Sequence, residues 1–415
     1  MRGFAWITIT VVLLAFASFS FAEDAGWEEL NSRVIKLYAQ AKYTEAEKLA
    51  RESIKLAEKT FGPDDPNLAK ALNNLGLILK AKGNYAQAEP LYLRALAIKE
   101  KNHGHDHPAV VISLNNLAEL AKARAAFAEA EPLYKRALKI REKHLGHDHP
   151  KVALSLNNLA GLYAAQANYD QAKPLYQRAL KIYLKTFGPN HLSVAQTLNN
   201  LAALHEAQQR YQKAESLYVC ALQISRESAG PCHPTTAAIL NNLASLYKLT
   251  ARPDKAQNCC EQALLIREKI LGTDHPDTAQ SLNNLASICE SQAKLAQAEA
   301  LYTRALQIWE KTLGPEHPHT ASAINNLALL LYHQQKYLQA EPLFTSALKI
   351  KEKTLGPTHP EVVAILENML DCCNKSGNTK RAKQLHHRLN QIREKRALEK
   401  NQSTENTSEQ SPAGG

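Results

Sequence analysis

Residues 154–189 read LSLNNLAGLYAAQANYDQAKPLYQRALKIYLKTFGP, and the trio Asn-Asn-Leu near their start recurs along the chain. Its copies begin 42 residues apart, at positions 73, 115, 157, 199, 241, 283 and 325. Degenerate copies lie one period outside this series, at Asn31 and at Glu367-Asn368-Met369. A fixed period of this length is typical of a solenoid in which each unit buries its apolar face only against its neighbours. The sequence therefore predicts nine units, anchored near positions 31, 73, 115, 157, 199, 241, 283, 325 and 367, within residues 27–396.

Each unit contains the apolar patterns of two amphipathic helices. In the quoted unit, positions 156, 159, 160, 162 and 163 fall on one side of a helix. A second stripe runs from Tyr169 to about Phe187, where Gly188 and Pro189 end the helix. Most units then continue with a polar residue and a proline, as in Asp148-His149-Pro150, which suits a helix start because the first amide has no partner there. Each unit is therefore expected to be a helix, a tight turn, a second helix and a loop.

The order Leu-x-x-Leu-Ala-x-x-Tyr, then Tyr-x-x-Ala-x-x-x-Tyr-x-x-Ala-Leu, resembles the tetratricopeptide repeat with Leu in place of its leading Trp. That repeat usually has about 34 residues, so the extra residues lengthen the helices and the loop. HEAT-type repeats have a similar length but lack the small residues found here at Ala160, Ala172 and Ala179. The elements Leu-Asn-Asn-Leu-Ala, Ala-Glu-Pro-Leu-Tyr and Leu-Gly-x-x-His-Pro are similar to the repeats of kinesin light chains. The resemblance implies an all-α fold, a right-handed α-α superhelix of about nine helix-turn-helix repeats.

The amino terminus differs in kind from the repeats. Arg2 precedes an apolar stretch from Phe4 to Phe21, and Ser20-Phe21-Ala22 offers small residues where a signal peptidase would cut. We therefore expect residues 1–22 to be a signal peptide that exports the protein to the periplasm or the medium. An uncleaved membrane anchor is the alternative, because about 18 apolar residues could just span a bilayer.

The carboxy terminus carries much of the net charge of +10. Between Lys380 and Lys400 there are eight basic and two acidic residues, with a thin apolar stripe. This pattern predicts a basic capping helix at about residues 380–400, with weak contact to a membrane surface as the alternative. Residues 401–415 have the composition of a disordered tail. The repeats themselves are nearly balanced in charge, so no nucleic-acid partner is expected.

The paired asparagines lie away from the apolar face of the first helix in each unit, where the superhelix would have its concave surface. An asparagine side chain offers a donor and an acceptor, as a peptide bond does. By resemblance to kinesin light chains and other peptide-binding tetratricopeptide proteins, the candidates for a peptide-binding groove are Asn73, Asn74, Asn115, Asn116, Asn157, Asn158, Asn199, Asn200, Asn241, Asn242, Asn283, Asn284, Asn325 and Asn326. Bridging between adjacent helices, or simple exposure to water, remains the alternative for these amides.

Charged residues of both signs, among them Lys80, Lys122 and Glu119, vary on the same predicted face, and Gly161 leaves room beside them. Mixed signs favour a polar, sequence-selective partner over a uniformly acidic one.

Enzymatic activity has little support in the sequence. His105-Asp106-His107 and His147-Asp148-His149 contain metal-ligand residues, but the same loop recurs with one histidine in most units, and a helix start explains all the copies. Glycine-rich phosphate loops and nucleophile elbows do not occur. We therefore expect no catalytic residues, no metal and no cofactor.

Five of the seven cysteines stand at apolar stripe positions, and the other two, Cys220 and Cys232, at surface or loop positions. A disulfide between these two is geometrically poor, because about three helical turns separate Cys220 from the end of its helix.

These observations predict a non-enzymatic scaffold that binds an extended peptide or a partner protein in the concave groove. The alternative is a structural or assembly component of an envelope or secreted complex, acting through its convex surface and its ends.

Removal of the signal peptide is expected to leave a mature chain that begins at Glu23. Intact-mass spectrometry of the protein from its native host measures this directly. A chain that still begins at Met1 in a membrane fraction would contradict cleavage and support the anchor.

Overall fold

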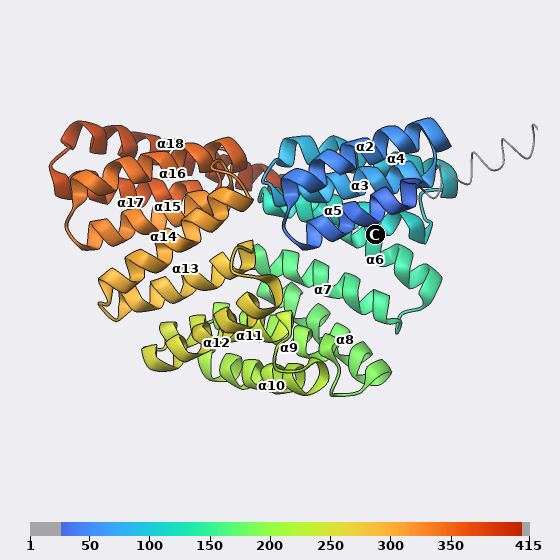
Figure 1. Ribbon diagram of the computed structural model, residues 1–415, viewed down its shortest axis with the longest axis horizontal. Coiled ribbons are helices and arrows are strands. Elements are labelled where there is room, and N and C mark those ends of the chain that lie inside the picture. The colour runs from blue at the N-terminus through green and yellow to red at the C-terminus, as the bar shows by residue number, and fades with distance from the viewer. Residues whose placement is uncertain (1–25, 409–415) are drawn as a thin grey trace, which may run out of the picture. The chain divides into compact units, whose positions relative to one another are not determined.

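The structure is a computed structural model that describes the backbone of residues 26–408 and the side chains of residues 26–395. Every regular element in this range is a helix, and consecutive helices lie side by side in pairs (Figure 1). The expected signal peptide and the last seven residues lie outside the described residues. The all-α prediction is confirmed.

The helices alternate between the first and second positions of the repeat. The first helices are residues 26–39, α3 (Pro66–Ala81), α5 (Val111–Ala123, preceded by the 3-10 segment η1, Pro108–Val110), α7 (Pro150–Ala165), α9 (Leu192–Ala207), α11 (Pro234–Leu249), α13 (Pro276–Ser291), α15 (Pro318–His333) and α17 (Pro360–Ser376). The second helices are α2 (Tyr43–Phe61), α4 (Tyr85–His103), α6 (Phe127–Leu145), α8 (Tyr169–Phe187), α10 (Tyr211–Ala229), α12 (Pro253–Leu271), α14 (Leu295–Thr312), α16 (Tyr337–Leu355) and α18 (Thr379–Ser408). The described residues thus form the nine helix pairs that the 42-residue period predicts.

The array divides into two compact units, one up to Ser281 and one from Leu282, with the boundary inside α13. The regular period of the sequence does not mark this division. Within each unit, the two helices of a repeat pack together and each second helix packs against the next first helix. In the first unit, for example, Leu75 and Ile78 of α3 share a core with Ala46 and Ala50 of α2. The apolar face of one repeat is therefore covered by its neighbour.

Ion pairs between successive second helices have a consistent direction in the first unit. The carboxylate comes from the earlier repeat and the guanidinium from the later one. The pairs are Glu58 with Arg94 at 2.7 Å, Glu100 with Arg136 at 2.6 Å and Glu142 with Arg178 at 2.7 Å. These side chains are partly exposed, so each pair contributes little stability.

Histidine starts the first helix in seven repeats. In each, the ring Nδ1 accepts a hydrogen bond from the backbone amide two residues later, at 3.0 to 3.2 Å. The residues are His107, His149, His191, His233, His275, His317 and His359. Asp65 does the same for α3, with its carboxylate 2.7 Å from the amide of Asn67. The predicted helix-start role of these loop histidines is confirmed.

The cysteines differ in burial, and Trp309 belongs to the core. The five cysteines of the apolar stripes are buried, and Cys220 and Cys232 are exposed free thiols. Trp309 is only 1% exposed and its ring stacks on His319 at 5.5 Å between centroids, so it is part of the core of the second unit.

The carboxy-terminal helix caps the second unit through Leu385, Leu389 and Ile392, which are buried against α17 and α16. This agrees with the expected capping helix. The helix continues to Ser408, however, so residues 401–408 are helical where a disordered tail was expected. No glycine or proline interrupts residues 379–408, and Pro412 is the next residue that cannot extend a helix. None of the described helices combines the length and the low polarity that crossing a bilayer requires.

Two helical glycines offer a test of the packing. A Cβ at Gly76 would lie 2.5 Å from Cε1 of the buried Tyr92, whereas a Cβ at Gly161 would meet only Tyr176 Oη at 3.5 Å and Lys122 Nζ at 3.9 Å. Gly76→Ala is therefore expected to lower the free energy of unfolding by about 1 to 3 kcal/mol. Gly161→Ala is expected to raise it by up to about 1 kcal/mol, because alanine favours the helix. Urea denaturation followed by circular dichroism compares the two, and equal effects would contradict the predicted clash.

The histidine at the start of α13 predicts sensitivity to acid. Burial, reinforced by Arg267 and opposed by Asp277, lowers the pKa of His275 below its ordinary 6.5. The unfolded chain then binds the proton more readily, so stability is retained above about pH 6.5 and is lost as pH falls from there through the lower pKa of the folded state. His275→Asp keeps an acceptor oxygen, as Asp65 does, and is expected to reduce this loss. Denaturation midpoints at pH 7.5 and pH 5 measure it, and an unchanged or larger loss in the variant would contradict the role of the ring.

Candidate functional site

The first unit contains a cavity of about 460 Å³ over the first helices of four consecutive repeats. Two tyrosines of α8 form part of its wall. The lining residues come from α5 (Glu119, Lys122), α7 (Leu154, Asn157, Asn158, Gly161), α8 (Tyr176, Tyr183), α9 (Gln196, Asn199, Asn200) and α11 (Thr235, Ala238, Ile239). Four of the fourteen predicted asparagines therefore meet in one hollow.

At four junctions, the second asparagine of a repeat donates a hydrogen bond to the first asparagine of the preceding repeat. In the first unit, Asn74 Nδ2 donates to Asn31 Oδ1 at 2.7 Å, and Asn116 Nδ2 donates to Asn73 Oδ1 at 3.2 Å. The remaining examples are Asn242 to Asn199 at 2.9 Å and, in the second unit, Asn326 to Asn283 at 2.7 Å. For these residues the bridging alternative holds, because their amides are engaged between repeats.

The first asparagine can also donate forward to a hydroxyl of the next repeat. The distances are 3.2 Å from Asn73 Nδ2 to Ser113 Oγ, 3.1 Å from Asn157 Nδ2 to Thr197 Oγ1 and 3.1 Å from Asn241 Nδ2 to Ser281 Oγ. All fourteen asparagines are buried or half-buried. Several of these amides therefore hold neighbouring helices together.

The row is interrupted at two successive junctions. Asn158 and Asn200 would be expected, by the pattern, to donate to Asn115 and Asn157, but neither makes a side-chain hydrogen bond within residues 26–395. The Oδ1 atoms of Asn115 and Asn157 are correspondingly buried without a donor, and Asn325 Oδ1 in the second unit is in the same state. A buried acceptor without a partner is costly, so each such atom requires an explanation. The interruption coincides with the cavity.

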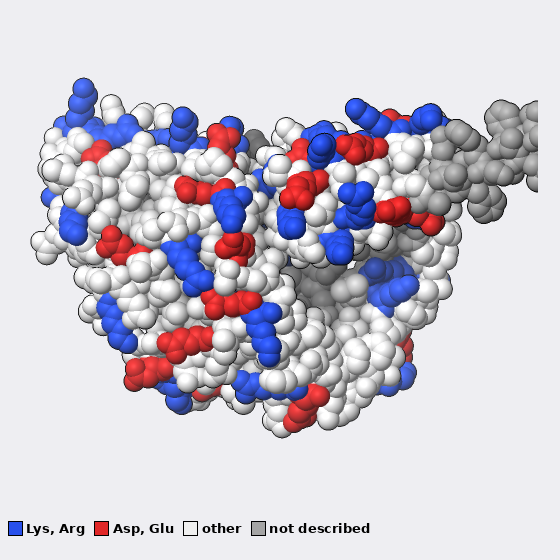
Figure 2. Space-filling model, in the orientation of Figure 1, with Lys and Arg blue, Asp and Glu red and all other residues white. Residues whose placement is uncertain are grey.

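A cluster of charges lies at one end of the cavity. Lys122 Nζ is 3.5 Å from Glu119 Oε1, Lys80 Nζ is 4.0 Å from Glu119 Oε2, and the Tyr134 hydroxyl donates to Glu119. Burial opposes ionisation of Glu119, but Lys122, Tyr134 and Lys80 outweigh it and lower its pKa. Burial, with Lys122 beside it, lowers the pKa of Lys80 against the pull of Glu119. The predicted mixture of signs on this face is confirmed, and Figure 2 likewise shows basic and acidic side chains interspersed over the visible surface.

Apolar and aromatic side chains complete the cavity. Leu154 is 46% exposed, and Ile112, at the same position one repeat earlier, is 60% exposed. Burial raises the pKa of Tyr176 to about 12, so its hydroxyl is neutral at physiological pH. Sequence reasoning missed Leu154 and Tyr176 as site residues. The available signal was that Leu154 and Ile112 are large aliphatic residues, where the later and earlier repeats have Lys70, Gln196, Ala238, Gln280, Ser322 and Ala364.

The histidine-rich loop is a separate feature. The rings of His103 and His107 stack at 4.8 Å between centroids, and His144 Nε2 lies 2.8 Å from the carbonyl of Asp106. Across the side chains that the structure describes, no three His, Cys, Asp or Glu residues form a group suited to holding a metal ion.

Comparisons with solved structures include kinesin light chain-like proteins. BtubC (BKLC) from P. vanneervenii is 27% identical over 57% of this chain and 92% of its own, with a TM-score of 0.43. A putative kinesin light chain from Podosopora anserina is 26% identical over 50% of this chain and 97% of its own, with a TM-score of 0.41. A Rap protein complexed with Competence and Sporulation Factor is 16% identical over 90% of this chain and 99% of its own, with a TM-score of 0.54.

Among curated proteins, none matches this sequence. A family model for the tetratricopeptide repeat matches eight overlapping segments, at residues 35–101, 69–143, 126–185, 151–227, 193–259, 235–311, 291–353 and 319–395. These segments cover most of the chain and follow the helix pairs described above. The chain therefore belongs to the tetratricopeptide repeat family, whose members are generally non-catalytic scaffolds for protein interactions.

Proposed function

We propose that this protein is a non-enzymatic scaffold that binds an extended segment of a partner protein in the cavity of the first unit. The observation that carries the proposal is the interruption of the amide row. Asn158 and Asn200 line the cavity without hydrogen bonds, and the oxygens of Asn115 and Asn157 lack donors beside them. A polypeptide backbone supplies groups complementary to the Asn158 and Asn200 amides, because each peptide bond has one donor and one acceptor.

The spacing of these amides suits an extended ligand. First helices of successive repeats pack about 10 Å apart, the width of a helix. An extended chain rises about 3.3 Å per residue, so every third peptide bond comes into register with the next repeat. Contacts on α7 and α9 would thus hold a segment of a few residues without bending it.

Side-chain selectivity comes from the ends of the cavity. Leu154 offers an exposed apolar contact, while Glu119 and Lys122 offer opposite charges 3.5 Å apart. Gly161 keeps space open between Lys122 and Tyr176. A segment with one apolar side chain and one charged or amide side chain would match both Leu154 and the Glu119–Lys122 pair.

The fold of the Rap protein supports the class of function. That protein was solved with Competence and Sporulation Factor bound, and its likeness to this chain is one of fold. We further propose that the segment preceding Glu23 exports the protein, so that the partner is met outside the cytoplasm.

Groove binding can be tested with peptides selected from a random 12-residue display library on the purified protein. The double variant Asn158→Ala and Asn200→Ala is expected to weaken the selected peptides about tenfold or more, because two hydrogen bonds contribute about 1 to 3 kcal/mol together. Gly161→Leu, which fills the cavity, is expected to abolish binding. Fluorescence anisotropy gives the affinities, and circular dichroism checks the fold.

The matched control is Asn74→Ala together with Asn326→Ala, which removes amides that bind Asn31 and Asn283 between repeats. This pair is expected to reduce stability while the peptide affinity stays within about twofold, since neither residue lines the cavity. Peptides that bind the folded Asn158/Asn200 variant and wild type equally would disprove the groove model.

A further inference from the structure

The first repeat ends the array with cations where every later repeat has an apolar residue. At the positions equivalent to Arg33 and Lys36, the later repeats have leucine, isoleucine, methionine or cysteine. These counterparts are buried, apart from the half-buried Leu327: Leu75, Leu117, Leu159, Leu201, Leu243, Leu285, Leu327 and Met369 for Arg33, and Ile78, Leu120, Leu162, Leu204, Leu246, Ile288, Leu330 and Cys372 for Lys36.

The equivalent face of a later repeat is covered by the preceding second helix. Leu75 and Ile78 of α3 pack in one cluster with Ala46 and Ala50 of α2. The first helix, residues 26–39, has no second helix before it among the described residues. The outer side of this helix therefore corresponds to the surface that packs against a second helix in later repeats. It has charged residues at the positions where those repeats have buried apolar residues.

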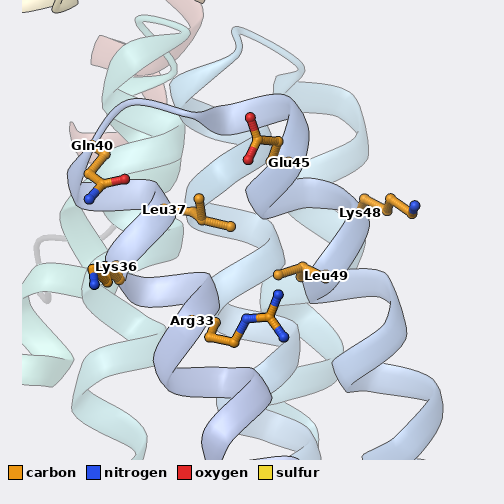
Figure 3. A pocket seen from close by; sticks show the side chains of 7 residues that line it. All are labelled: Arg33, Lys36, Leu37, Gln40, Glu45, Lys48 and Leu49. Atoms are coloured by element: carbon orange, nitrogen blue, oxygen red, sulfur yellow. The ribbon is translucent and has the colours of Figure 1, made fainter.

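A cavity of about 460 Å³ lies on this surface between the first helix and α2. We call it the end cavity; its lining residues are Arg33, Lys36, Leu37, Gln40, Glu45, Lys48 and Leu49. Figure 3 shows Leu37 and Leu49 facing each other across the gap between the two helices, with Arg33 extending into the same gap. Leu37 is half-buried, whereas its counterpart Leu79 is 1% exposed. The floor of the end cavity is thus apolar and open.

The rim of the end cavity is basic. Arg33, Lys36 and Lys48 form no ion pair with any described side chain, and Glu45 is the single acidic residue of the lining. Unpaired cations around an apolar floor are complementary to a ligand with carboxylates around an apolar side.

A second copy of this chain does not provide that ligand. At later junctions, Lys82 pairs with Glu47 at 2.7 Å and Arg94 pairs with Glu58 at 2.7 Å, both on the preceding helix. The first repeat has Gln40 and Glu52 at those two positions, so it lacks the cations that a preceding repeat of this chain would meet. The cavity at the opposite end of the array, between α17 and α18, is lined by Lys383, His386 and His387, so end-to-end stacking would bring basic groups together.

We propose that the end cavity binds an amphipathic helix of another protein, with leucine-type side chains against Leu37 and Leu49 and carboxylates against Arg33 and Lys36. The helix lies where a preceding second helix would lie. This surface is distinct from the asparagine-lined cavity, so the array has two binding sites with different ligand chemistry.

The test uses the mature protein and a labelled 19-residue peptide with the α2 sequence, Tyr43–Phe61, in which the three lysines and the arginine are replaced by glutamate. Fluorescence anisotropy at low salt is expected to show binding that 0.5 M NaCl weakens about tenfold, as ion pairing requires. The double variant Arg33→Glu and Lys36→Glu is expected to lose the acidic peptide at least tenfold and to gain the unmodified α2 peptide.

The matched control, Lys55→Glu with Lys213→Glu, makes the same change in net charge at exposed lysines outside the end cavity. It is expected to bind the acidic peptide within about twofold of wild type, as is the Asn158→Ala and Asn200→Ala variant. Equal loss in the lysine control would show diffuse attraction and overturn the proposal, as would no binding to wild type.

Two further probes test whether the end cavity has a different occupant. Vesicles of phosphatidylserine and phosphatidylcholine in equal parts should not depend on Arg33 and Lys36. A synthetic peptide of residues 1–22 should not compete with the acidic peptide. Vesicle binding that the Arg33/Lys36 variant alone loses, or competition by residues 1–22, would assign the cavity to a membrane or to this chain's own leader and would contradict the partner helix.

Discussion

One repeat of this chain cannot bury its own apolar surface, so each helix pair depends on the next for cover. Leu75 and Ile78 of α3 close over α2, and the same exchange recurs at each later position in the unit. Because burial of apolar area is the main stabilising term in folding, polar groups near these junctions must be satisfied without disturbing that contact. The histidine helix starts and the asparagine bridges meet this demand with side chains that recur at the same period.

The asparagines serve the junctions first, and a binding role arises where the junctions leave them unused. A bridge such as Asn116 to Asn73 uses one donor and one acceptor, so few hydrogen-bonding groups remain for a ligand. At Asn158 and Asn200 the same residue type is retained but the bridge is not made, and the hollow lies beside them. The same position of the repeat thus has a structural role in some repeats and a binding role in others. The repeated motif alone does not show which role a given asparagine has.

The fold could be predicted from the sequence because the period, the apolar stripes and the residues at helix ends all indicate the same helix pairs. Loop histidines were interpreted correctly, since a recurring role explains all of them. The site was predicted only in part. Whether Asn158 bridges or stays open depends on distances of about 1 Å across a junction, which residue identity does not encode. Leu154 escaped notice because its apolar character is unusual only by comparison with the same position in other repeats. The burial of Trp309 depends on contact with His319, which lies in a different helix.

The ion pairs that join Glu58 to Arg94, Glu100 to Arg136 and Glu142 to Arg178 give the first four repeats a distinguishable front and back. Among these four repeats, a gene segment of 42 codons can therefore be duplicated or lost while the residues that meet remain the same kinds. Such events change the length of the array and move the hollow nearer to one terminus, yet create no mismatched charges.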